Sequence, residues 1–180
     1  MLLVKRITAI NARPITGVVN SYPNDSDPNW PSKTYLQGAI DGGIVKPGDE
    51  VEYTIYYLNT GNNSAKNVRI CDRLHKSLVF QTQFDPANIA TVGKGINFTP
   101  GNSTSQYLTN GAGDDRGFLS TLGSLPDNCN LASNPTDSAS LSNNVLVVDV
   151  VNGVDYLPGA ISPGNPPNSF GYIRFKAKIQ

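Results

Sequence analysis

Hydrophobic and polar residues alternate most clearly between Val51 and Leu58. Every second position there is apolar or aromatic: Val51, Tyr53, Ile55 and Tyr57. This period of two predicts a half-buried β-strand with one apolar face. Turn-forming residues flank it, Pro47-Gly48-Asp49 before and Asn59 to Ser64 after. A second strand, Lys66 to Cys71, is predicted directly behind the polar loop, as is typical of antiparallel sheets.

Similar patterns predict strands elsewhere in the chain. Val145 to Val151 is rich in β-branched residues and predicts a buried strand. Alternating apolar residues from Ser169 to Ile179 predict a last strand. Shorter strands are expected at Leu2 to Ile10, Leu78 to Phe80, Ile96 to Thr99 and Phe118 to Leu119. No long window has helical periodicity, so we expect an all-β antiparallel sandwich.

The chain has 180 residues, a length that fits one domain with a well-buried core. We interpret it as a single domain that spans residues 1 to 180. The 17 glycines and 13 prolines agree with a fold that has many turns.

The charge balance excludes some partners. Lysine and arginine total 14, as do aspartate and glutamate. Without a net positive charge the chain is not expected to bind nucleic acid, which needs a basic face. The longest apolar runs, such as Val145 to Val151, are far shorter than the roughly 20 residues of a membrane helix. We therefore expect no membrane insertion by this domain.

The central strands also carry a family resemblance. The order Pro47-Gly48-Asp49, Val51-Glu52-Tyr53-Thr54-Ile55, Asn59-Thr60-Gly61 and Ala65 to Asp72 resembles the conserved repeat domain of bacterial surface proteins, called domain of unknown function eleven. Leu2 to Thr8 is similar to the first strand of that family. Tyr156 to Gly159, followed by Gly171 to Ile179, is similar to its closing hairpin. The cysteine in Ile70-Cys71-Asp72 and the first strand are most similar to cyanobacterial members. Residues 11 to 40 and 81 to 144 match the family pattern poorly, which implies long insertions that vary within the family.

The resemblance implies an immunoglobulin-like sandwich on an exported protein, and it implies no reaction. We therefore expect a non-catalytic structural or adhesive module, displayed outside the cell on a bacterial surface protein. Its expected partners are neighbouring domains or other surface proteins and glycans. The main alternative is a carbohydrate-binding module. An enzyme is the weakest alternative, because no acid–base or nucleophile set is evident.

Two kinds of candidate ligand site follow from residue types. Trp30 and Tyr56 could belong to an aromatic platform for a sugar, although such residues more often pack in cores and on sheets. Acidic clusters around Asp25 and Asp27, and around Asp114 and Asp115, could bind calcium. Neither cluster completes a calcium-loop spacing. We expect solvated loops there and no cofactor, with calcium as the alternative.

Cys71 and Cys129 are the only cysteines. With the single His75 they match no zinc pattern, so we predict a structural disulfide rather than a metal site. Two separate buried thiols are the alternative. A disulfide persists only in an oxidising compartment, so this prediction also favours an exported protein.

Lys5 and His75 raise two further possibilities. Pilin-like sandwiches join a first-strand lysine to an Asn or Asp on the last strand by an isopeptide bond, with help from an acid such as Glu52. The last strand here has neither Asn nor Asp, so we expect Lys5 to face solvent. His75 follows Asp72 closely, but without a nucleophile we expect it to be a turn residue.

Overall fold

Strands form nearly all the regular structure of the computed structural model, which describes residues 1–19, 23–108, 117–121, 141–150 and 156–180. The strands are β1 (Leu2–Ile10), β2 (Arg13–Pro14), β3 (Val18–Val19), β4 (Gly38–Ala39), β5 (Glu50–Leu58), β6 (Arg69–His75), β7 (Leu78–Phe80), β8 (Ile96–Pro100), β9 (Gln106–Leu108), β10 (Gly117–Thr121), β11 (Leu141–Asp149) and β12 (Phe170–Ile179). Two single 3-10 turns, η1 (Pro23–Ser26) and η2 (Ile89–Thr91), complete the elements. In the described part of the chain, no helix is long and apolar enough to cross a membrane.

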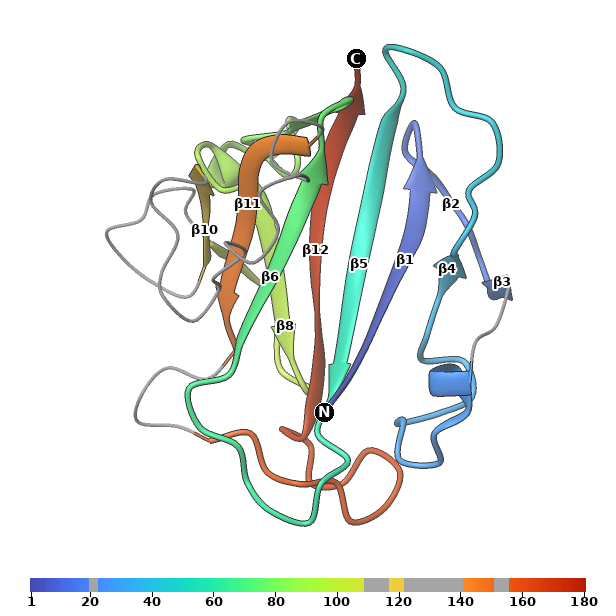
Figure 1. Cartoon of the computed structure of the whole chain (residues 1–180), viewed down its shortest axis with the longest axis vertical. Helices are drawn as coiled ribbons and strands as arrows, with labels where there is room; N and C mark the ends of the chain where they lie inside the picture. The colour runs from blue at the N-terminus through green and yellow to red at the C-terminus, as the bar shows by residue number, and fades with distance from the viewer. Residues whose placement is uncertain (20–22, 109–116, 122–140, 151–155) are drawn as a thin grey trace.

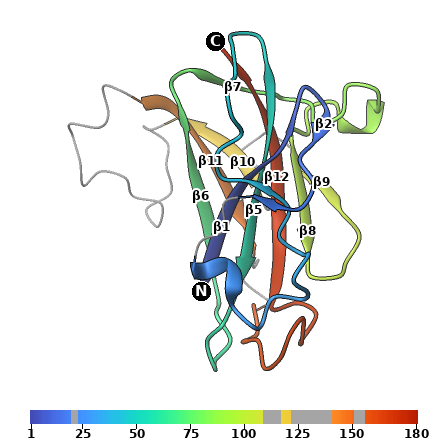
Figure 2. The ribbon, with the colours of Figure 1, turned by 90° about the vertical axis from the view of Figure 1, so that its right-hand side faces the viewer.

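The strands form two sheets that pack against each other (Figures 1 and 2). The large sheet has the order β3-β4-β1-β5-β12-β8-β9, with β2 and β7 beside β1 and β12. The small sheet has the order β10-β11-β6. All strand pairs are antiparallel except the two-residue pair of β3 and β4. The predicted all-β sandwich is therefore confirmed, apart from this short parallel pair.

The main core lies between the two sheets. β5 contributes Ile55 and Tyr57, and β12 contributes Ile173 and Phe175. The remaining members come from both sheets and the adjoining loops: Ile70, Leu74, Phe80, Ile96, Phe98, Leu108, Leu146, Val148, Val150 and Leu157. We call the side of the large sheet that faces this core its inner face. The alternation of β5 and β12 fits this face well, because their odd-numbered residues supply the core.

The outer face of the large sheet is also covered in part. Trp30 and Leu36, from the segment between β3 and β4, pack there on Val4 and Tyr56. Leu58, Ala160 and Phe170 complete this second cluster. We call residues 23–40 the covering segment. Gly38 allows its close approach to β1, since it has φ +95 and a Cβ there would lie 2.4 Å from the carbonyl oxygen of Ile7.

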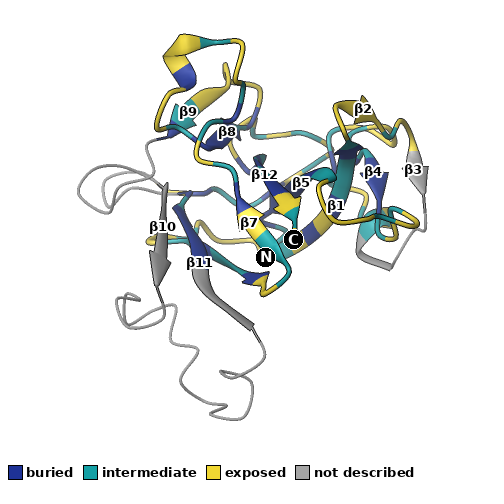
Figure 3. Cartoon of the chain, turned by 90° about the horizontal axis from the view of Figure 1, so that it is seen from above, coloured by how far each residue is buried: buried dark blue, intermediate teal, exposed yellow. Residues whose placement is uncertain are grey.

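The covering segment explains one error in the sequence interpretation. The alternation of β5 predicted a strand with a single apolar face. In the structure Thr54 and Tyr56, on the polar face, are as deeply buried as their inner-face neighbours. Figure 3 shows buried residues along β5 and β12 at the centre of the molecule. A strand at the centre of a sheet that is covered on both sides is buried on both faces.

Strand boundaries follow the sequence prediction closely for β1, β7 and β12. The second central strand begins at Arg69 rather than Lys66 and continues to His75. This shift places Leu74 in the core. The sequence did not predict β2, β3, β4 and β9. Each of them has only two or three residues, which is too short for a pattern of alternating residues to be recognised. The predicted Asn152-Gly153 turn lies outside the described residues.

Candidate functional site

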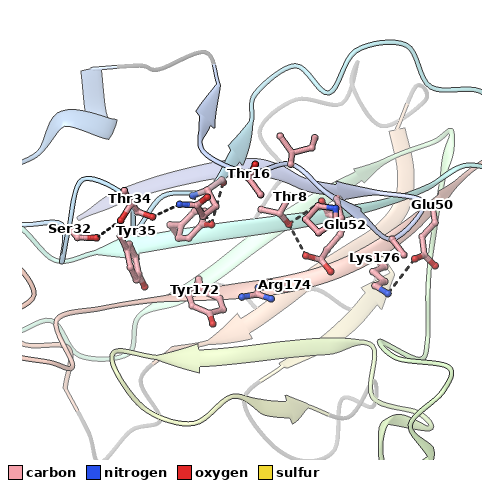
Figure 4. Close-up of a pocket in the computed structure, with 16 residues that line it drawn as sticks. Thr8, Thr16, Ser32, Thr34, Tyr35, Glu50, Glu52, Tyr172, Arg174 and Lys176 are labelled. Carbon is pink, nitrogen blue, oxygen red and sulfur yellow. Dashed lines mark hydrogen bonds and ion pairs between the residues drawn. The ribbon is translucent and has the colours of Figure 1, made fainter.

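A groove of about 740 Å³ opens on the outer face of the large sheet, beside the covering segment. Its floor is formed by side chains of β1, β5 and β12, including Thr8, Glu52 and Arg174 (Figure 4). One wall is formed by residues 32–37 of the covering segment, and another by residues 12–16 after β1. The volume falls within the range of about 300–1,000 Å³ that is usual for small-ligand sites.

A β-bulge in β1 shapes the floor of the groove. The pairing of β1 with β5 shifts by one residue between Ile7 and Ala9, so that Thr8 and Ala9 both lie opposite Glu52. The Thr8 hydroxyl lies 2.8 Å from a carboxylate oxygen of Glu52, to which it donates, and 2.9 Å from the hydroxyl of Thr54. The Thr8 hydroxyl, which lies at the bulge, therefore helps to fix the position of the Glu52 carboxylate.

Arg174 lies at the centre of the groove. It projects from the outer face of β12, and its guanidinium carbon lies 4.7 Å from the centre of the Tyr172 ring. This distance is typical of a cation–π contact. Among the residues that the structure describes, no carboxylate forms an ion pair with Arg174 and no acceptor takes a hydrogen bond from it. Arg174 is therefore a positioned cation without a counterion in the described part of the chain.

Lys176, the other cation at the groove, already has a partner. Lys176 Nζ lies 3.3 Å from the Glu50 carboxylate and 5.2 Å from the centre of the Phe84 ring. Lys176 and Glu50 thus form an ion pair at one end of the groove (Figure 4). The centre is left with a positive group, Arg174, and a negative group, Glu52.

Tyrosines form the opposite end of the groove. Tyr35 stacks on Trp30 with ring centres 5.8 Å apart and meets Phe170 edge-on at 5.3 Å. Burial raises the pKa of Tyr35 far above its usual range, and burial also raises the pKa of Tyr56. Both phenols therefore stay protonated at neutral pH. The Tyr56 hydroxyl accepts a hydrogen bond from the backbone amide of Gln37 at 3.0 Å, and this bond links the covering segment to the sheet.

The predicted sugar platform is wrong for the two residues named. Trp30 is only 4% exposed and Tyr56 only 5%. Both belong to the cluster beneath the covering segment, so neither presents a ring face to solvent. Tyr172 and Arg174 were missed, although a signal existed. They alternate with Ile173 and Phe175, so the sequence already placed them together on the face opposite the core.

The acidic clusters proposed for calcium lie in different settings. Asp25 forms an ion pair with the fully buried Arg6 of β1, so its charge is already neutralised. The Asp27 carboxylate accepts from the Asn29 amide at 2.8 Å. Asp114 and Asp115 lie outside the described residues, so the solvated loop expected there, with calcium as the alternative, stays a prediction.

Lys5 pairs with a residue that sequence reasoning did not connect to it. Its Nζ lies 2.6 Å from the Asp72 carboxylate of β6, and 4.7 Å from the centre of the Tyr53 ring. The pair links the two sheets at their open side. Glu52, the acid considered for an isopeptide bond, points instead to the outer face. His75 is exposed and its Nδ1 accepts from the Ser77 amide at 3.2 Å, while Asp72 pairs with Lys5.

Cys71 lies on β6, next to the core residue Ile70. Because Ile70 faces the core, Cys71 belongs to the opposite side of the small sheet. Its predicted partner Cys129 lies outside the described residues. The disulfide stays a prediction.

Comparison with known proteins gives no relative for this chain. No family model matches it, and no curated protein or solved structure does either. The resemblance to the conserved repeat domain therefore rests on the motifs of the sequence.

Proposed function

We propose that this domain is a non-catalytic, load-bearing spacer within an exported bacterial surface protein. One observation carries the proposal. The N-terminal end of β1 lies beside Leu58, and the C-terminal end of β12 lies beside Glu50, at the other end of β5. The chain therefore enters and leaves at opposite ends of the same central strand (Figure 1). Such a domain adds its length to an array of neighbouring domains.

The pairing geometry suits such a role. β1 and β12 are both antiparallel to β5 and flank it on either side. Tension between the two ends would pull β1 and β12 in opposite directions along β5. The hydrogen bonds of both ladders would then be loaded in shear and would have to break together. When strands are pulled apart from one end, by contrast, each bond of about 0.5–1.5 kcal/mol breaks separately.

Contacts made by β1 would strengthen this arrangement. Lys5 links β1 to β6 of the small sheet, and the buried Arg6 pairs with Asp25 of the covering segment. The first strand under load is thus joined to both layers that cover the large sheet.

The non-catalytic part of the proposal is supported by the partners of the polar residues. Asp72 and His75, the acid and base considered from sequence, contact Lys5 and Ser77 instead of each other. Extracellular location and attachment to neighbouring domains are supported by the resemblance to the conserved repeat domain, and they are proposed with it.

Single-molecule stretching tests the proposal. One form is held at residues 1 and 180, so that β1 and β12 are sheared along β5. The control form is held at position 46, through a Lys46→Cys substitution, and at residue 180. These two positions lie just before β5 and just after β12, at the same end of the two strands. The Gly48 amide donates to the Ile179 carbonyl there at 2.9 Å. We expect a several-fold higher unfolding force for the first form, since forced unfolding reports the unfolding barrier. Equal forces in both directions would refute the load-bearing role.

A further inference from the structure

We propose that the groove on the outer face binds a saccharide that carries carboxylate groups, with Arg174 as the anchor for one carboxylate. This proposal concerns the outer face and does not depend on a load-bearing role. It differs from the sugar platform considered from sequence, because it uses neither Trp30 nor Tyr56 as a stacking surface.

The state of Arg174 is the first support. Arg6, Arg69 and Lys176 each have a carboxylate partner: Asp25, Asp149 and Glu50 respectively. Arg174 has none among the described residues, although it is half-buried and held against Tyr172. A guanidinium is charged at every physiological pH, and its N–H groups match a carboxylate in a two-bond, planar arrangement. A ligand carboxylate would supply the counterion that the described residues do not.

The polar groups around Arg174 suit sugar hydroxyls. Thr16, Ser32 and Thr34 contribute hydroxyl groups to the walls, and Gln37 contributes an amide. The Glu52 carboxylate, held by Thr8, is an acceptor on the floor. Sugar rings offer many donors and acceptors, so a groove with such a lining can match them.

The backbone at the groove favours a saccharide over a peptide. An extended peptide usually binds by adding a strand to an open sheet edge, where main-chain groups are unpaired. The floor of the groove is the face of β5 and β12, and both strands are already paired on each side. A peptide would find no backbone partners there and would depend on side chains alone.

The charges also limit the density of acidic groups on the ligand. The lining contains two carboxylates, Glu50 and Glu52, and two cations, Lys176 and Arg174, so its formal net charge is zero. A densely sulfated polymer would meet Glu52 as a repulsive neighbour. The best fit is a chain in which a uronate, which supplies one carboxylate, alternates with uncharged sugars.

Titration calorimetry with a hyaluronan oligosaccharide, in which glucuronate alternates with an uncharged sugar, tests this fit. Its carboxyl-reduced form is the matched ligand control, because it keeps the ring and the hydroxyls. We expect the reduced form to bind about tenfold or more weakly, as the loss of a charge-assisted hydrogen bond implies. A heparin oligosaccharide and oligoglutamate serve as competitors, and we expect both to bind more weakly than hyaluronan.

Variants of β12 test the anchor. Arg174→Gln should weaken binding of the oligosaccharide about tenfold or more, and Arg174→Lys should restore it only in part, because lysine lacks the planar fork. Lys178→Gln is the matched control: it removes the same charge from the exposed end of the same strand and should change affinity by about twofold or less. The thermal midpoint of each variant checks that it is folded.

Three results would overturn the proposal. The first is equal affinity of the native domain for the oligosaccharide and its carboxyl-reduced form, which requires no variant. The second is an unchanged affinity in a folded Arg174→Gln domain. The third is tighter binding of oligoglutamate or heparin, which would assign the groove to an acidic peptide or to a sulfated polymer. None of these results would change the unfolding force measured between residues 1 and 180.

Discussion

The two faces of the large sheet are built on different principles. The inner face meets the small sheet through apolar side chains such as Phe98, Ile173 and Phe175, none of which is exposed. The outer face carries an aromatic cluster, a buried ion pair and a polar groove. Apolar packing dominates the inner face, with the Lys5–Asp72 pair at its open side. On the outer face the same strands also position charged groups, and the proposed saccharide site lies there.

Truncation of the inner face should have the largest effect. Phe175 stacks on Tyr53 with ring centres 5.4 Å apart and is fully buried. Phe175→Ala should lower the free energy of unfolding by about 4–5 kcal/mol, through lost burial and a cavity. Tyr172→Ala, on the outer face of the same strand, should cost about 1–2 kcal/mol. Urea titrations of both variants provide the comparison, and equal losses would contradict the different roles of the two faces.

The outer face should respond most to its buried ion pair. Arg6→Met leaves Asp25 as a buried charge without this guanidinium and should cost about 3–4 kcal/mol. The double variant Arg6→Met with Asp25→Leu should recover most of that loss, because two apolar side chains can replace a buried pair. Chemical denaturation measures both. If the double variant is no more stable than the single one, the pair is not the main contact between β1 and η1.

The Cys71–Cys129 disulfide should come next in size. A bridge that closes the long loop between Cys71 and Cys129 should stabilise the fold by about 2–4 kcal/mol, chiefly by restricting the unfolded chain. We expect the intact mass to rise on reduction by the mass of two hydrogen atoms. Cys71→Ser should then lower the midpoint of unfolding under oxidising conditions only. Alkylation of both cysteines in protein purified without reductant would disprove the bridge and weaken the proposal of export.

High pH should weaken the outer face by a smaller, graded amount. Burial raises the pKa of Tyr35 above its ordinary value of about 10, so the fold holds the protonated phenol. The stability from this group is complete below pH 10 and falls as the pH rises further, by up to about 1.4 kcal/mol per pH unit. Tyr35→Phe keeps the ring contacts and should make the loss above pH 10 shallower. Identical pH profiles of the variant and the native domain would count against burial of this hydroxyl.

The sequence predicted the inner face better than the outer face, for a physical reason. β5 and β12 each alternate over nine or ten residues, and this regularity identified their core positions without knowledge of the fold. The covering segment has no such regularity. Trp30 and Leu36 are isolated apolar residues among prolines and polar residues, and only the tertiary fold brings them onto Val4 and Tyr56.

The groove was partly predictable for the same reason. Tyr172, Arg174 and Lys176 share a face of β12 by simple alternation. The sequence could not show which of them lacks a partner. Only the structure shows that Lys176 has a carboxylate partner, whereas Arg174 has none among the described residues. The bulge at Thr8, in the floor of the groove, also has no sequence signal such as a glycine.

The single tryptophan allows the most direct test of the two-faced sheet. Trp30 is the only tryptophan and lies in the outer cluster, so its fluorescence reports on the covering segment alone. Far-UV circular dichroism reports on the strands of both sheets. If the covering segment is an integral layer, the native indole should resist acrylamide quenching, and both signals should change at the same urea concentration. A readily quenched indole, or a fluorescence transition well below that of the strands, would contradict an outer face built into the fold.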